Sequence, residues 1–388
     1  MTEKLFYKDA YTKEFTAKVL SCRACEKKRG YAVVLDKTAF FPEGGGQYAD
    51  VGTLSGIKVK DVQEKDGEIF HYTEEPLKEG ETISGKIDWE IRFSRMQQHT
   101  AEHILSGLVH ERYGYDNVGF HLNDDFCTMD FNGFISGEEM KDIETKANRA
   151  VYENKRIEVL YPSEEELKSL IYRSKIEIEG QVRIVKIPGY DICACCAPHL
   201  GSTGEIGQIK IIGMMKYKGG IRLTMVSGQR ALLDHQNREK DMKAISGLLS
   251  AKEQELPEAV ERLKEENDKL KNELLRFQRM LIGYKAERIS ADEKAVCLFE
   301  EELDGTGIRE LMNRILDRGA KVCAVFLKKE QDSYQYVLGS RTSDVRSYGK
   351  ALNETFSGRG GGKPEMIQGS LSGTEEEIRR FFEEITNE

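Results

Sequence analysis

The chain has 388 residues, of which 39% are hydrophobic and 32% are charged, and its formal net charge is −9 at pH 7. This length predicts two or three domains, because a single hydrophobic core usually stops growing at about 250 to 300 residues. The acidic balance argues against a protein that coats nucleic acid with its whole surface. No apolar run reaches the length of about 18 residues that predicts a membrane span.

The first residues, MTEKLFYKDAYTKEF, are charged from the outset and lack the apolar core of a signal peptide. The eight cysteines do not suggest a disulfide framework in a chain of this length, which is large enough to form its own core. We therefore expect a cytoplasmic protein with reduced thiols. Cys22 and Cys25 form a CxxC pair without a second pair at zinc-knuckle spacing, which predicts a turn between two strands.

Residues 1–88 are predicted to form a β-rich domain, a small barrel or a curled sheet. Runs of β-branched and aromatic residues lie between glycine-containing or charged turns. They are EFTAKVLSC, GYAVVLD, IKVKDVQ and EIFHYT. The loop EGGGQ, residues 43–47, lies in this region, and its glycines let backbone N–H groups approach a ligand closely. Taken alone, the loop is equally typical of a tight turn between strands.

The hydrophobic pattern changes from strand-like to helical near residue 90 and predicts a helix that ends before Gly114. Apolar residues gather largely on one face of this helix: Ile91, Met96, Ile104, Leu105, Leu108 and Val109. The segment QQHTAEH places His99 and His103 four residues apart, so both imidazoles project from one face with Cβ atoms about 6 Å apart. This spacing permits a shared metal ion without proving one.

The rest of residues 89–235 predicts an α+β domain with a mainly antiparallel sheet. Two further helices begin with the capping boxes Ser136 to Glu139 and Ser163 to Glu166. Strand-like runs lie between and after these helices. They are CTMDF, RIEVLY, QVRIVKI, GQIKII and IRLTMV.

Residues 236–290 form a charged stretch with an apolar seam that follows alternating steps of three and four. The seam comprises Val260, Leu263, Asn267, Leu270, Leu274, Phe277, Leu281 and Tyr284. Asn267 takes a core position where a polar residue fixes register in parallel dimers, so we expect a helical arm that joins two copies of the chain in a homodimer. The alternatives are one long helix packed on its own domain or an antiparallel hairpin broken at Pro257.

Residues 291–388 alternate strand and helix and predict a final α/β domain. Its segment SGRGGGKPEMIQGS carries three glycines between Arg359 and Lys363, which suit backbone contact with phosphate but also a mobile loop. Two smaller basic islands occupy residues 22–30 and 216–222, and each alone is typical of a solvated loop.

The segment CCAPHLGSTGEIG supplies the ligands that the histidine helix lacks. Cys195 and His199 form a CxxxH pair in a turn that contains Pro198. Together with His99 and His103 they offer three imidazoles and one thiolate, a donor set suited to tetrahedral Zn²⁺. Cys193 and Cys196 remain possible substitutes for Cys195, because spacing does not rank neighbouring cysteines.

Four motifs occur in a fixed order: FFPEGGGQYADVG, RMQQHTAEHILSG, CCAPHLGSTGEIGQIKI and IRLTMVSGQRAL. This combination resembles the editing domain of alanyl-tRNA synthetase and the free-standing AlaX editing proteins, and GRGGGKPEMIQG resembles the DHH-associated domain that follows it. The family's metal ligands fall on His99, His103, Cys195 and His199. Residues 196–198 replace the family's usual glycine-glycine-threonine and resemble threonyl-tRNA synthetase editing domains instead. No aminoacylation core precedes the motifs, so we expect action in trans.

The resemblance implies a zinc-dependent deacylase that hydrolyses the ester of tRNA for alanine wrongly charged with serine or glycine. Gln47 and Thr38 are the candidate catalytic residues: Gln47 to orient water or bind the substrate, and Thr38 to bind the serine hydroxyl. The candidate substrate-binding residues are Gly44, Gly45, Gly46, His121 and Arg222. The candidate tRNA-binding residues are Arg359, Gly360, Gly361, Gly362 and Lys363.

Three points stay open from the sequence. Four protein ligands are typical of a closed structural zinc site, whereas catalytic zinc usually keeps one open position, so the ion either takes part in hydrolysis or organises the pocket. HTAEH also matches the H-x-x-E-H signature of inverted zinc metallopeptidases, in which Glu102 would be the general base. On the editing interpretation Glu102 is a solvated or supporting helix residue. A third possibility is a zinc-stabilised tRNA-binding module without catalysis.

Overall fold

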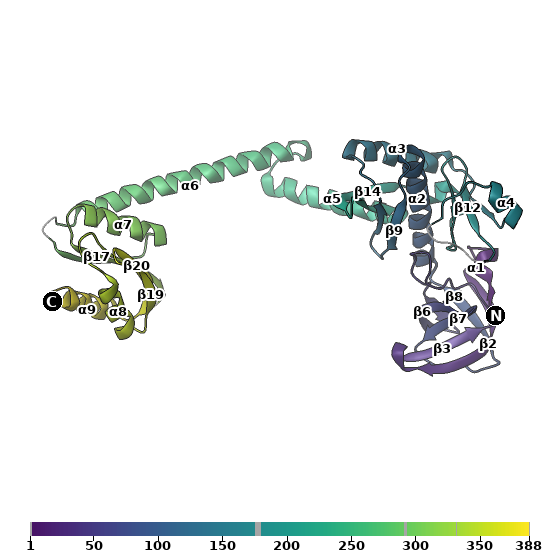
Figure 1. The fold of residues 1–388 in the computed structure, drawn as a ribbon, viewed down its shortest axis with the longest axis horizontal. Coiled ribbons are helices and arrows are strands. Elements are labelled where there is room, and N and C mark those ends of the chain that lie inside the picture. The colour runs from purple at the N-terminus through teal and green to yellow at the C-terminus, as the bar shows by residue number, and fades with distance from the viewer. Residues whose placement is uncertain (1, 175–179, 291–292, 331, 388) are drawn as a thin grey trace. The chain divides into compact units, whose positions relative to one another are not determined.

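The computed structural model describes residues 2–174, 180–290, 293–330 and 332–387, which form two compact units, Met1–Ala244 and Ile245–Glu388. Each unit combines sheets with helices, which confirms the mixed α+β class (Figure 1). The finer division into four domains remains a prediction. None of the helices in the described part of the chain has the length and apolar character that a bilayer span requires.

The first unit begins with a closed barrel whose strands are neighbours in the order β2-β3-β7-β6-β5-β8. Their bounds are β2 Glu14–Cys25, β3 Gly30–Leu35, β5 Gly52–Leu54, β6 Ile57–Lys65, β7 Glu68–Thr73 and β8 Thr82–Ile87. Side chains alternate between the two faces of a strand, and the inward ones, such as Val33, Val59 and Ile69, fill the barrel core. Before the barrel, β1 (Glu3–Lys4) pairs in parallel with β4 (Lys37–Thr38), and α1 spans Leu5–Lys8.

The CxxC pair lies at the end of β2 rather than in a turn, which corrects the expectation from the sequence. The turn follows it as a short 3-10 helix, Glu26–Lys28, because Arg29 adopts a left-handed backbone conformation (φ 49°) that reverses the chain into β3.

Helix α2, Trp89–Tyr113, is the predicted histidine helix. The Asp88 carboxylate accepts a hydrogen bond from the Ile91 N–H at 3.2 Å and caps its start, and the helix ends at Gly114 as expected. Most residues between Arg92 and Val109 are buried, including polar ones. The middle of the helix is therefore enclosed, and the imidazoles of His99 and His103 lie in the interior of the unit.

Two antiparallel sheets and a helix pack against α2. The four-stranded sheet has the order β14-β15-β10-β9, and the three-stranded sheet has the order β11-β12-β13. Their bounds are β9 Asn117–Leu122, β10 Cys127–Phe131, β14 Ile209–Tyr217 and β15 Gly220–Ser227, then β11 Glu158–Leu160, β12 Ile184–Ile187 and β13 Asp191–Ala194. Helices α3 (Gly137–Glu153) and α4 (Glu164–Ser169) both begin with the predicted capping boxes. A 3-10 turn, Thr203–Ile206, follows the CxxxH segment.

Helix α5, Gly228–Leu249, crosses the boundary between the units and precedes a 3-10 turn, Glu253–Glu255. Helix α6 then runs unbroken over Leu256–Glu287, with Pro257 in its first turn, where proline is tolerated. Its seam residues are exposed along most of the helix, whereas Ile282 and Ala286 near its end pack into the second unit's core.

The second unit contains a five-stranded sheet with the order β16-β17-β18-β20-β19. Its strands are β16 Ala295–Glu300, β17 Val322–Glu330, β18 Ser333–Ser340, β19 Arg359–Lys363 and β20 Met366–Ser372, and its other helices are α7 Gly305–Asp317, α8 Arg346–Thr355 and α9 Glu375–Asn387. The second unit has two clusters of buried side chains. One includes residues of α6 and α7, and the other includes residues of α8 and α9. The glycine run is not a loop: it forms the exposed edge strand β19, paired with β20.

Candidate metal and substrate site

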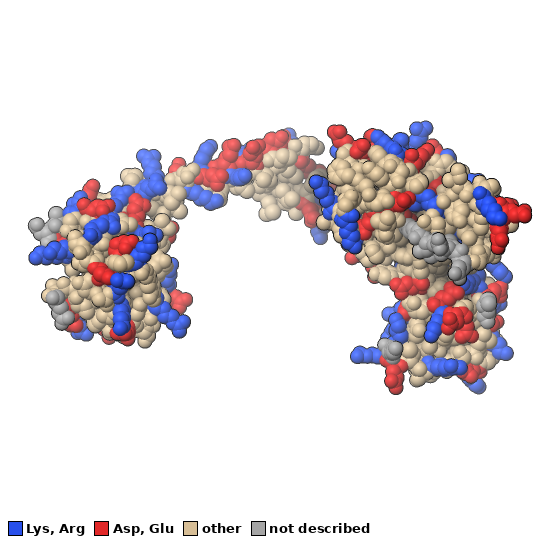
Figure 2. All heavy atoms as spheres, viewed as in Figure 1, with Lys and Arg blue, Asp and Glu red and all other residues tan. Residues whose placement is uncertain are grey.

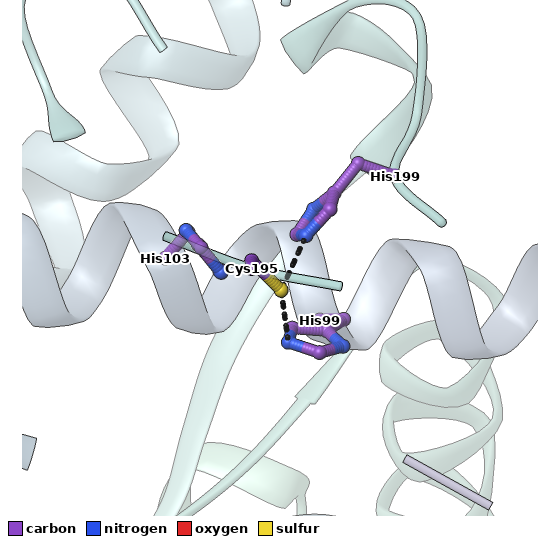
Figure 3. A group of neighbouring side chains, drawn as sticks. All are labelled: His99, His103, Cys195 and His199. Carbon is purple, nitrogen blue, oxygen red and sulfur yellow. Dashed lines mark hydrogen bonds between the residues drawn. The ribbon is translucent and has the colours of Figure 1, made fainter. Parts of the chain in front are cut away.

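Four side chains from distant parts of the sequence meet in the first unit. The donor atoms of His99, His103, Cys195 and His199 all lie within 4.8 Å of one another (Figure 3). Cys195 Sγ is 3.6 Å from His99 Nε2 and 3.4 Å from His199 Nε2. A zinc ion with ordinary Zn–S and Zn–N bonds at the tetrahedral angle separates S and N by about 3.5 Å. The donor set and its spacing therefore fit zinc.

Each imidazole in the group has its Nδ1 atom against a polar side chain. The pairs are His99 with Gln47 Oε1 at 3.0 Å, His103 with Asp191 Oδ2 at 2.9 Å and His199 with Thr100 Oγ1 at 3.1 Å. An imidazole whose Nδ1–H donates in this way presents its Nε2 lone pair to an ion. The three partners thus fix the ring orientations that a shared ion needs.

The loop that carries Cys195 is held in place by Arg183. The Arg183 guanidinium donates through Nη1 to the carbonyl oxygens of Cys195 at 2.7 Å and Ala197 at 2.9 Å.

Of the three clustered cysteines, Cys195 is the one in the four-residue group, whereas Cys193 Sγ contacts the Ala194 carbonyl and Cys196 is exposed. Burial disfavours the thiolate of Cys195, but the imidazoles of His99, His199 and His103 outweigh burial and hold its pKa well below the ordinary value.

A cleft of about 670 Å³ opens beside this group. Its lining residues are Glu43, Gly44, Gly46, Gln47, Tyr48, His121, Leu122, Asn123, Phe126, Thr128 and Arg222. Gln47 connects the cleft to the imidazoles, since its Oε1 accepts from His99. Its side-chain Nε2 is buried and has no hydrogen-bond partner among the described residues, and the residue is only 1% exposed. A buried donor without a partner is costly, so this amide is poised to bind a ligand group.

The glycine-rich loop needs glycine where it meets β9. Gly46 has φ +80°, and a Cβ atom there would lie 2.8 Å from both the ring and the carbonyl oxygen of Phe120. A buried ion pair anchors the loop's far end to α2: Arg92 Nε lies 2.8 Å from Asp50 Oδ1, and Arg92 Nη2 donates to the Ala39 carbonyl at 2.7 Å. Buried hydrogen bonds and an ion pair therefore hold the loop against the histidine helix.

Three segments match known families. Residues 1–91 match "tRNA synthetases class II (A)", residues 182–224 match "Threonyl and Alanyl tRNA synthetase second additional domain", and residues 292–388 match "DHHA1 domain". The "Alanyl-tRNA editing protein AlaX-L" of Pyrococcus horikoshii is 29% identical over 398 residues, covering 97% of this chain and 96% of that protein. The chain is thus similar over nearly its whole length to an AlaX-type alanyl-tRNA editing protein.

The chain also matches part of larger relatives. The "Alanine--tRNA ligase" of Pyrococcus furiosus is 32% identical over 397 residues, which cover 95% of this chain and 42% of the ligase, and that of Pyrococcus abyssi matches equally. The chain thus spans less than half the length of these ligases. The solved C-Ala domain of Aquifex aeolicus alanyl-tRNA synthetase aligns with 24% of this chain and 91% of that domain at 21% identity, with a TM-score of 0.22.

Of the other candidate residues, His121 and Arg222 lie with Gly44, Gly46 and Gln47 at the cleft. The Arg222 guanidinium also pairs with both oxygens of the Asp130 carboxylate, at 2.6 and 2.7 Å. Gly45 sits in the same loop, with Cys196 Sγ 3.1 Å from where its Cβ would be.

Thr38 is not among the residues that line the cleft. It is fully buried in the barrel, its hydroxyl lies 2.8 Å from His71 Nε2, and its oxygen accepts from the Phe40 N–H. Its role toward the serine hydroxyl remains a prediction. The five predicted tRNA-binding residues form β19 in the second unit, exposed along the whole strand.

We expected Glu102 to be either a solvated or a supporting helix residue, and the structure excludes the solvated alternative. Glu102 is 1% exposed, and its Oε1 accepts from Ser106 Oγ at 2.7 Å and Asn117 Nδ2 at 2.6 Å.

The sequence patterns did not predict the residues that hold the imidazoles and the loop. Asp191 had a usable signal, because DICAC places it on the same strand face as Cys193 and Cys195. Thr100, Arg173 and Arg183 had none.

Proposed function

We propose that this chain hydrolyses the ester bond of tRNA for alanine that wrongly carries serine or glycine. The observation that carries the proposal is the buried group of three imidazoles and one thiolate, joined through Gln47 to a cleft of about 670 Å³. Such a cleft has the size of a small-molecule site and admits the aminoacylated terminal nucleoside. The likeness to an alanyl-tRNA editing protein supports this choice of substrate.

His99, His103, Cys195 and His199 would hold the zinc ion. When bound, zinc supplies positive charge that polarises an ester carbonyl or lowers the pKa of a water molecule. Gln47 Nε2 donates a hydrogen bond to the ester carbonyl oxygen or to the attacking water, and the glycine-rich loop lets the substrate approach its backbone closely. A pocket whose polar groups bind the serine hydroxyl rejects alanine, because those groups would then stay unpaired.

The test compares hydrolysis of seryl-, glycyl- and alanyl-tRNA for alanine by the wild type and by His103→Ala, with zinc content measured in each. His110→Ala is the matched control, since His110 lies on the same helix, is exposed and pairs with Asp116 at 3.0 Å. We expect the wild type and His110→Ala to hydrolyse the seryl or glycyl ester rapidly and to spare the alanyl ester. His103→Ala should hydrolyse none of them. Bound zinc with every ester intact would instead support a tRNA-binding module.

The peptidase alternative is less favoured. Its metal site would be completed by a distant carboxylate, whereas the group here adds Cys195 and His199 to the helical pair. Glu102 also accepts hydrogen bonds from Ser106 and Asn117. Cleavage of a peptide substrate that is lost in Glu102→Gln, with esters of tRNA untouched, would reverse this preference.

We propose that β19 of the second unit contacts the tRNA backbone. Arg359 and Lys363 flank three glycines on an exposed edge, where strand N–H groups and both cations can meet phosphates. Lys and Arg are interspersed with Asp and Glu on the face shown in Figure 2. The proposal therefore rests on the residues of β19 and not on a large basic patch. Replacing both Arg359 and Lys363 with alanine should make the slope of log K for tRNA binding against log salt concentration shallower, by about one for each lost phosphate contact. Arg380→Ala, an exposed cation on α9, should leave it unchanged.

A further inference from the structure

A chain of hydrogen bonds leads away from the candidate metal site through Asp191. Its Oδ2 lies 2.9 Å from His103 Nδ1, and Arg173 donates from Nε to Oδ1 at 2.8 Å and from Nη2 to Oδ2 at 2.9 Å. The Asp191 side chain is 1% exposed and that of Arg173 is 13% exposed. Neither residue belongs to the four proposed ligands.

The backbone brings this pair to His103 at close range. Gly107 lies one helical turn after His103, and a Cβ there would be 2.1 Å from the Tyr190 carbonyl oxygen and 2.9 Å from Asp191 Cβ. Only glycine lets β13 approach α2 this closely. Arg173 is fixed in turn by backbone hydrogen bonds to β13: its N–H donates to Ile192 and its carbonyl accepts from Ala194, at 2.8 and 2.9 Å.

His103 belongs to two possible donor groups. Besides the four-residue group, His103, Asp191 and Cys193 also place donor atoms within 4.8 Å of one another. An ion in that second position would need Asp191 as a ligand. The bidentate contact with Arg173 engages both carboxylate oxygens, and such a contact is strong and geometrically specific. Arg173 also lines a cleft of about 440 Å³ on that side, together with Asp191.

We propose that Asp191 and Arg173 are positioning residues that commit His103 Nε2 to the four-residue metal site. Asp191 orients the ring through Nδ1, and Arg173 keeps Asp191 from becoming a ligand, so the ion is not drawn toward Cys193. This inference rests on the zinc site of the proposed function but not on the ester chemistry, since it concerns how tightly and where the ion is held.

The test measures zinc affinity of the full chain by competition with a chelating indicator, together with the absorption spectrum of the Co²⁺-substituted protein. The variants are Asp191→Asn, Arg173→Gln and Arg173→Lys. Glu144→Gln is the matched control: this partly buried carboxylate pairs with Lys210 at 2.7 Å and accepts the Ile211 N–H, away from the metal ligands.

We expect Asp191→Asn to weaken zinc binding about 10- to 100-fold, the usual effect of losing such a partner. Arg173→Gln should weaken it too and change the Co²⁺ spectrum, because Asp191 and Cys193 can then compete for the ion. Arg173→Lys should restore part of the affinity, and Glu144→Gln should retain all of it.

Wild-type zinc affinity and Co²⁺ spectra in both Asp191→Asn and Arg173→Gln would overturn the proposal. An equal loss in Glu144→Gln would overturn it as well, because it would show a general effect of removing a buried carboxylate. A wild-type chain that binds zinc but hydrolyses no ester would refute the proposed function and leave this comparison intact.

Discussion

Gln47 Oε1 lies 3.0 Å from His99 Nδ1, so one hydrogen bond joins the glycine-rich loop to the histidine helix. The same amide keeps its Nε2 donor buried and without a partner among the described residues. One side chain thus orients a proposed metal ligand with its oxygen and holds a donor nitrogen without a partner, which we propose binds the substrate.

These two roles separate in Gln47→Glu, which keeps an acceptor for His99 but removes the donor. We expect kcat for seryl-tRNA to fall about 10²- to 10³-fold, the usual loss when a donor to the developing oxyanion is removed, with zinc content unchanged. Gln208→Glu, at an exposed position, is the control. If zinc and activity fall in parallel, Gln47 acts only through His99.

Gly107→Ala should disturb the contact between α2 and β13. Because its Cβ would lie 2.1 Å from the Tyr190 carbonyl oxygen, the strand must move away from the helix, at a cost of about 1 to 3 kcal/mol in the free energy of unfolding. Zinc affinity should also fall, since Asp191 moves with the strand. Urea unfolding and zinc titration measure the two effects.

Gly247→Ala provides a control of opposite sign. Gly247 lies in α5 with nothing within 4 Å of its Cβ position, so alanine should stabilise this helix by about 1 kcal/mol. A Gly107→Ala protein as stable as the wild type would refute the close approach of helix and strand.

His71 should make stability depend on pH. Its burial in the barrel lowers its pKa to about 4, despite a hydrogen bond to the Val33 carbonyl. Since the unfolded chain then binds more protons at this site between about pH 6.5 and 4, the contribution is complete above pH 6.5 and falls with decreasing pH, by on the order of 3 kcal/mol.

Urea unfolding at pH 7 and pH 5 measures this effect in the wild type and in His71→Gln, whose amide does not titrate. The wild type should lose more stability than the variant between the two pH values. Equal losses would show that His71 is not buried in its neutral form.

The exposed seam of α6 predicts a dimer in which two copies pair their helices. Leu270, Leu274 and Phe277 are 65%, 59% and 63% exposed. A row of exposed apolar side chains is unfavourable in water, and a partner helix would bury it. Sedimentation equilibrium should give a dimer for the wild type and a monomer for Leu270→Asp combined with Leu274→Asp. Asn272→Asp, off the seam on the same helix, should remain dimeric. A wild-type monomer at all concentrations would refute the pairing.

The sequence by itself determined the local structure around the site. The span of α2 and the capping boxes at Ser136 and Ser163 follow from contacts within a few residues, so the local sequence patterns predicted them. The helical spacing of His99 and His103 likewise follows from one turn of helix. The CxxxH spacing of Cys195 and His199 supplied the second ligand pair, and the family resemblance placed the family's metal ligands on the same four residues.

Only the tertiary structure decided which partners those residues meet. That Cys195 rather than Cys196 joins the imidazoles depends on how β13 and its following loop lie against α2. The glycine run became an edge strand because β20 pairs with it, a contact that glycine composition does not encode.

The contacts of Asp191 and Arg173 were likewise decided only by the tertiary structure. Asp191 meets His103 across 88 residues and Arg173 meets Asp191 across 18 residues, and no local pattern specifies which segments meet when the chain packs. Hydrogen bonds to neighbouring residues are set by the chain's own periodicity, whereas these bonds are set by close packing of helix against strand at Gly107, which only the folded structure defines.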